Sequence, residues 1–179
     1  MRKLTLALSF LAITAMGSSA VAQQWTEYRV PDARFRVEMP GKPELSTMSI
    51  PEMGSLKLTQ AMVETADGWF VAGYVNVPPD QITNVDANTV LDSARDITMA
   101  WLSSRNDKSQ LRADRHLVVS GYPARHVVAE VPILESTFLF VARFVFNGRQ
   151  VIVITFTGPF GSETQPEVVR FFNSLSFQQ

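Results

Sequence analysis

The sequence predicts an α+β fold, an antiparallel sheet with helices on both faces. Three observations predict it. Short apolar or alternating segments recur along the chain and are separated by turn residues, which indicates hairpins. Two other segments carry apolar residues at helical spacing. The hairpin around Asn147-Gly148 is apolar on both faces, so a helix must cover each side of the sheet.

The first 22 residues have the pattern of a cleavable export signal. Two basic residues (2–3) precede an apolar run over 4–16, and small residues lead to Ala20 and Ala22. We expect cleavage after Ala22 and a periplasmic product. A retained membrane anchor is the alternative, but the run is shorter than the roughly 20 residues that span a bilayer. We therefore expect no stable membrane insertion after cleavage.

The remainder, 23–179, has the length of a single domain that can bury a core without cross-links. The chain contains no cysteine, which excludes a disulfide framework, a thiol nucleophile and iron–sulfur ligation. Once the signal and its two basic residues are removed, acidic residues outnumber basic ones. A basic surface for nucleic acid is therefore not expected.

The first half of this domain reads as strands. A short strand is expected at 25–29, and strict alternation of polar and apolar residues predicts another at 34–39. Its inward-facing residues should be Phe35, Val37 and Met39. The segments 56–64 and 69–77 flank an Asp-Gly turn and predict a hairpin.

Two helices follow from their spacing. The first is expected at 86–104, with Asp86 or Asn88 as its N-cap. The second should begin with a capping box of Ser162 and Gln165. Its apolar stripe should consist of Val168, Val169 and Phe172. A last short strand is expected at 175–177.

Two further hairpins are expected. The segments 111–119 and 125–131 flank a turn at 120–123. Centring that turn on Gly121 pairs Arg112 with Glu130, Asp114 with Val128 and His116 with His126. Asn147-Gly148 predicts a type I′ turn that pairs Phe144 with Val151 and Val141 with Ile154. Arg143 lies within the second hairpin, where we expect a structural ion pair with a carboxylate of a covering helix.

Four segments resemble PsbP-like domains. Their opening F-x-V-x-x-P strand and turn resemble 35–43 (FRVEMPGKP), and their mid-chain turn resembles 121–125 (GYPAR). Their late hairpin and closing helix and strand resemble 146–149 (FNGR) and 171–177 (FFNSLSF). The resemblance implies an α/β/α sandwich in a family of mostly accessory or partner-binding proteins. Those proteins share no active site, so no catalytic residue is transferred to this chain.

One constellation could hold a metal ion. If His116 and His126 lie opposite each other, two imidazoles can bind one divalent ion, and Asp114 can complete an open site. The alternative is that both histidines are polar residues on a solvated face. We expect no cofactor. The G-x-S-x-G motif of serine hydrolases is absent, and Ser120 near His116 has no identifiable third partner.

Other features have plainer readings. Trp69 and Trp101 are expected in the core. Met48, Ile50 and Met53 form either a partner-facing patch or edge-loop packing.

We therefore expect a non-enzymatic accessory or partner-binding protein, with an envelope protein as its partner. The alternative is a small hydrolase or metal-binding protein that uses the His116 and His126 face.

Overall fold

The computed structural model describes residues 24–50 and 56–177. The predicted export signal and Met53 lie outside these ranges. The strands are β1 (Thr26–Val30), β2 (Phe35–Met39), β3 (Glu44–Ile50), β4 (Leu56–Thr65), β5 (Gly68–Asn76), β6 (Gln110–Val119), β7 (Tyr122–Ile133), β8 (Ser136–Phe146), β9 (Gln150–Pro159) and β10 (Ser176–Phe177). The α-helices are α1 (Pro79–Ile82), α2 (Ala87–Arg105) and α3 (Pro166–Ser174). Short 3-10 helices occur at Pro31–Ala33 and Ser162–Thr164.

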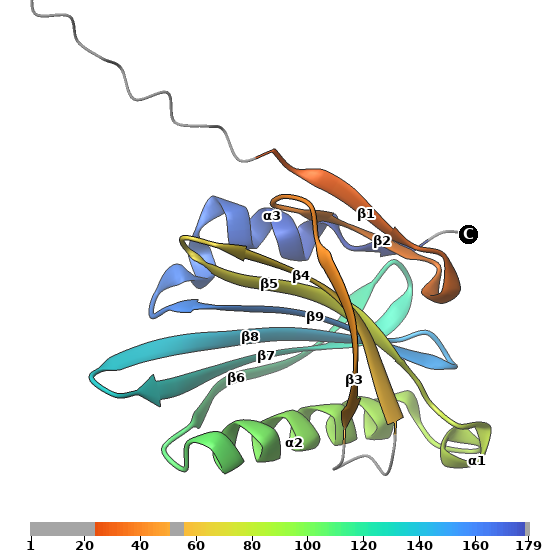
Figure 1. The fold of residues 1–179 in the computed structure, drawn as a ribbon. Coiled ribbons are helices and arrows are strands. Elements are labelled where there is room, and N and C mark those ends of the chain that lie inside the picture. Colours follow the sequence, from red (N-terminus) through yellow and green to blue (C-terminus); the bar gives the residue numbers. More distant parts are fainter. Residues whose placement is uncertain (1–23, 51–55, 178–179) are drawn as a thin grey trace, which may run out of the picture.

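Seven strands form the main sheet in the order β3-β4-β5-β9-β8-β7-β6, and every neighbouring pair is antiparallel. A small sheet of β1, β2 and β10 lies beside it. Helix α2 runs along one side of the main sheet, whereas α3 and the small sheet lie on the other side (Figure 1). The α+β class is thus confirmed. In the described ranges, no helix is long and apolar enough to cross a membrane.

Alternate residues of the central strands enter two separate cores. Val141 and Val145 of β8 join the cluster that contains Phe171 and Phe172 of α3. Phe144, which lies between them in sequence, joins the cluster that contains the α2 residues Leu91, Ala94 and Leu102. The prediction that the β8–β9 hairpin is apolar on both faces is therefore confirmed. The small sheet adds Phe35, Val37 and Met39, all buried as predicted.

The register of the β6–β7 hairpin differs from the prediction by one residue. Val119 pairs with Tyr122, so the turn consists of Ser120 and Gly121 alone, with φ values of +51° and +86°. Positive φ at both central residues is the requirement of a type I′ turn. The register shifts between Leu111 and Ala113, where Arg112 is the extra residue, as in a β-bulge. A slip of one residue moves a side chain to the other face of a sheet.

The β8–β9 hairpin keeps its predicted faces but shifts by two residues. Phe144 pairs with Val153 rather than with Val151. Asn147 is not among the residues with positive φ, whereas Gly148 has a φ of +91°. The Asn147 side chain accepts hydrogen bonds from the backbone N–H groups of Arg149 and Gln150, at 3.1 and 2.8 Å. This Asx-type bonding moves the turn one residue along the chain.

The bounds of the first helix are confirmed almost to the residue. Asp86 caps α2 as predicted, because its side chain accepts a hydrogen bond from the Asn88 N–H at 2.9 Å. The predicted capping box of the second helix is wrong. Ser162 donates instead to the carbonyl of Pro159, and α3 begins at Pro166 without a side-chain cap. Phe171 is buried together with Val168 and Phe172, whereas Val169, which was expected in the apolar stripe, is 43% exposed.

Two further details, the exposure of Trp69 and the presence of strand β3, depart from the sequence reading. Trp69 is 38% exposed rather than in the core. Strand β3 escaped prediction because nearly all of its residues are exposed, as befits an edge strand whose side chains carry no apolar alternation. Met48 is 42% exposed on that strand.

Candidate functional site

The structure does not bring the predicted metal ligands together. His116 lies opposite Arg125, and His126 lies opposite Arg115, so the two imidazoles are on opposite faces of the hairpin. His116 Nδ1 is 3.2 Å from Asn88 Oδ1. Within the described ranges, no group of three or more His, Cys, Asp or Glu residues could hold a metal ion. The predicted register, on which the constellation depended, is wrong because the turn contains two residues instead of three.

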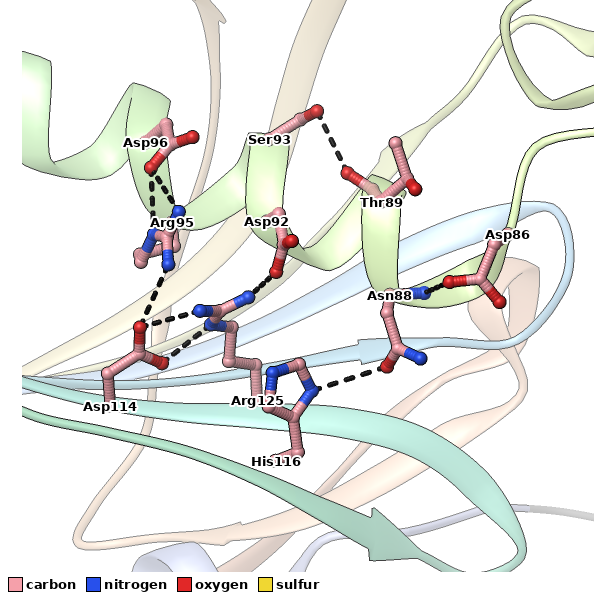
Figure 2. Close-up of polar contacts among 10 residues, drawn as sticks. All are labelled: Asp86, Asn88, Thr89, Asp92, Ser93, Arg95, Asp96, Asp114, His116 and Arg125. Atoms are coloured by element: carbon pink, nitrogen blue, oxygen red, sulfur yellow. Dashed lines mark hydrogen bonds and ion pairs between the residues drawn. The ribbon is translucent and has the colours of Figure 1, made fainter.

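Asp114 instead belongs to an ion network, here called the α2 clamp, that consists of Asp92, Arg95, Asp114 and Arg125 (Figure 2). Arg125 donates from Nε and Nη2 to the two carboxylate oxygens of Asp114, both at 2.6 Å. Its Nη1 pairs with Asp92 on α2. Arg95, also on α2, donates to Asp114 at 2.9 Å.

The α2 clamp is a structural feature. The Arg125 side chain is only 6% exposed, and its charge is matched by carboxylates from both the helix and the hairpin. Breaking a buried pair leaves an unmatched charge, so the clamp holds α2 against β6 and β7. All four charges are engaged within the protein, which leaves none of them dedicated to a ligand.

A pocket lies along the other side of α2. Its volume is about 350 Å³, and it opens between the helix and the face of the sheet formed by β3, β4, β5, β9 and β8. The helix contributes Val90, Ala94 and Ile97 to its walls. The sheet contributes Val75, Phe144 and Val153.

Helix α2 makes its main contacts to the sheet with β7 and β8, and the pocket lies toward the strands beyond them. The apolar side chains of Val153 and Ile97 consequently stay only half-buried, although they face the interior side of the sheet and helix. Within residues 24–50 and 56–177, the core leaves these apolar surfaces partly uncovered.

Among the described residues, none that lines the pocket is charged. Ser93 and Thr98 are among its polar residues, but their hydroxyls donate to the helix carbonyls of Thr89 and Ala94, at 2.9 and 2.8 Å. Pockets of about 300–1,000 Å³ with mostly apolar walls are typical of small-molecule sites. The arrangement can therefore enclose an uncharged apolar group.

Comparisons with known proteins identify a shared fold. No protein-family model matches the chain, and no curated protein matches it. The solution structure of cyanobacterial PsbP (CyanoP) from Synechocystis sp. PCC 6803 is similar over 93% of this chain and 99% of its own, with 13% identity and a TM-score of 0.56. This likeness concerns the fold alone.

Two other structures align less well. A protein of unknown function from Pseudomonas aeruginosa, PA94, described as a putative regulator, has 12% identity over 87% of this chain and 98% of its own, with a TM-score of 0.46. LpqN, involved in cell envelope biogenesis of Mycobacterium tuberculosis, has 10% identity over 87% of this chain and 91% of its own, with a TM-score of 0.45.

Proposed function

We propose that this chain is an exported module with a PsbP-like α/β/α sandwich, that it acts by binding rather than by catalysis, and that the pocket beside α2 takes the apolar part of a small molecule. The uncharged apolar walls of that pocket carry the proposal. Binding there removes apolar surface from water without burying a charged side chain of the described walls.

The size of the pocket supports a small molecule over a polypeptide as its occupant. Its volume of about 350 Å³ is near the lower end for ligand sites, whereas a helix laid into a groove has a diameter of about 10 Å. A periplasmic location and an envelope protein as partner belong to the same proposal, and both rest on the signal pattern of residues 1–22.

The alternative, a small hydrolase or metal-binding protein that uses the His116 and His126 face, has no observation in its favour. The two histidines face opposite sides of the hairpin, and Asp114 is held by two arginines. An acid–base or metal mechanism through that trio needs groups within hydrogen-bond or ligand distance of a common atom.

A pocket-filling variant tests the binding proposal. In Val90→Trp an indole ring replaces an isopropyl group in the wall of the pocket. Val169→Trp is the matched control, because Val169 is an exposed valine on α3. We expect the exported protein to bind the neutral apolar dye Nile red, and Val90→Trp to weaken that binding about tenfold or more, as expected for a filled apolar site. Val169→Trp should bind like the parent.

The same preparation tests the rest of the proposal. Native mass spectrometry of the exported protein should give a mass that lacks residues 1–22 and reveal any co-purified small molecule. Thermal unfolding of both variants confirms that each is folded. Equal dye binding by the parent and by folded Val90→Trp contradicts a site in this pocket.

A further inference from the structure

Three basic side chains form a row across the face of the main sheet opposite the pocket. Arg115 of β6 pairs with His126 of β7, and His126 pairs in turn with Arg143 of β8. Directly opposed residues lie on one face with their Cβ atoms about 5 Å apart. The ring of Phe172 on α3 closes one side, 5.6 Å from the His126 ring and 5.2 Å from the Arg143 guanidinium.

This row lacks the carboxylates that other arginines of the chain have. Among the described residues, neither Arg115 nor Arg143 makes an ion pair. Two of its nitrogens, His126 Nδ1 and Arg143 Nε, are buried without a hydrogen-bond partner in that part of the chain. A buried polar group left without a hydrogen-bond partner is destabilising.

The free side of Arg143 has the geometry of a carboxylate receptor. Its Nη1 donates to the Phe172 carbonyl at 2.5 Å, and within the described ranges no residue accepts from Nε, which is buried, or from Nη2. On the other face of the same sheet, Arg125 uses this edge to hold both oxygens of Asp114. Planar guanidinium and carboxylate groups match in such bidentate pairs.

We propose that Arg115, His126 and Arg143 form a binding site for a carboxylate group of a ligand or partner. The carboxylate accepts from the free edge of Arg143, and the exposed Arg115 side chain closes over it from solvent. A singly charged planar carboxylate is favoured over a phosphate dianion, because the half-buried position beside Phe172 makes desolvation of a second charge costly. This site is independent of the proposed apolar pocket, which lies on the opposite face.

The environment of His126 supports this assignment. Burial, followed by the charges of Arg143 and Arg115, lowers the pKa of His126 to about 4. The imidazole is therefore neutral at pH 7 and sits in a field of uncompensated positive charge. A bound carboxylate places a negative charge beside the ring and so raises the pKa of His126. The ring signals of His126 therefore report whether the site is occupied.

Nuclear magnetic resonance of the two imidazoles tests the site. Acetate is titrated into the labelled exported protein at pH 7, with sodium chloride keeping the ionic strength constant. We expect a saturable shift of the His126 ring signals and a rise in the His126 pKa. His116, on the opposite face, is the internal reference and should not respond.

Variants locate the anion. Arg115→Gln removes an exposed charge and should weaken acetate binding about tenfold, the effect of losing one charge-assisted contact. Arg143→Lys keeps the charge but removes the bidentate edge, and should weaken binding at least as much. Arg105→Gln, an exposed α2 arginine on the opposite side, should leave it unchanged. Thermal unfolding checks that each variant is folded.

Three results overturn the proposal. Parallel shifts of His116 and His126 indicate general salt effects. Unchanged acetate affinity in folded Arg115→Gln means that the row of Arg115, His126 and Arg143 does not bind the anion. Saturable binding of inorganic phosphate without binding of acetate shows that the site takes a different anion.

Discussion

Two arginines in neighbouring strands show how the same side chain takes different roles in one sheet. Arg125 meets carboxylates on the α2 side, whereas Arg143 meets the last turn of α3 on the other side. The expected carboxylate partner of Arg143 is wrong. Its partner is the Phe172 carbonyl, one of the last four carbonyls of α3, which have no partner within the helix. A cation at a helix C-terminus is also favoured by the helix dipole.

At this residue scale, His126 makes the stability of the fold depend on pH. The groups that face it are Arg115, Arg143 and the uncharged Phe172, and its pKa of about 4 lies below the 6.5 of a free histidine. The unfolded chain therefore takes up a proton first as pH falls. Stability is full above pH 6.5 and is lost progressively between pH 6.5 and 4. Allowing for the solvent access of the ring, we expect a loss of about 1–2 kcal/mol.

Chemical denaturation at pH 7.5 and at pH 4 measures this loss. His126→Gln should show a smaller decrease over the same interval, because glutamine does not titrate. His116→Gln should behave like the parent, because His116 lies on the other face of the hairpin. Identical pH dependence in the parent and in His126→Gln contradicts the assignment.

At the scale of elements, apolar periodicity was enough to predict most strands, both faces of the β8–β9 hairpin and the bounds of α2. Hairpin registers were harder to predict, because they depend on which residue takes a positive φ. Ser120 takes one in the β6–β7 turn, whereas Asn147 does not in the β8–β9 turn, although asparagine is the more favourable residue there. This one-residue difference places His116 and His126 on opposite faces of the hairpin.

The α2 clamp gives the element-scale prediction. Arg125→Met should lower the free energy of unfolding by about 2–3 kcal/mol. The reason is that Asp114, whose side chain is 19% exposed, loses its bidentate partner and retains only Arg95. Arg29→Met removes an arginine that is 62% exposed and pairs with Glu27, and should cost less than about 1 kcal/mol.

Urea denaturation of both variants beside the parent measures the difference. Equal small losses for Arg125→Met and Arg29→Met mean that the clamp does not hold the helix. Addition of Arg95→Met to the first variant should cause a further loss, because Asp114 then has no cation.

For the whole molecule, the two cores and the pocket follow from how far each covering layer extends over one sheet. Helix α3 and the small sheet cover one face through the cluster that includes Phe35 and Phe171. The single long helix on the other face leaves the pocket uncovered. The sequence could indicate that both faces are apolar, but not which strands α2 crosses. Val90 and Ile97 therefore read as ordinary members of a buried stripe, and the pocket escaped prediction.

Because both cores use the same strands, we predict that residues 24–177 unfold as one cooperative domain, in which loss of packing on either face opens the shared sheet. Leu91→Ala on α2 and Phe171→Ala on α3 remove side chains with 0% exposure, and each should cost about 3–5 kcal/mol. Far-ultraviolet circular dichroism and tryptophan fluorescence should give coincident transitions in the parent and in both variants. Trp101 reports on the α2 side, and Trp25, which packs against Phe70, reports on the α3 side. A variant in which the transition seen by circular dichroism shifts and the fluorescence transition does not, or the reverse, shows that the two faces unfold separately. That result contradicts a single domain.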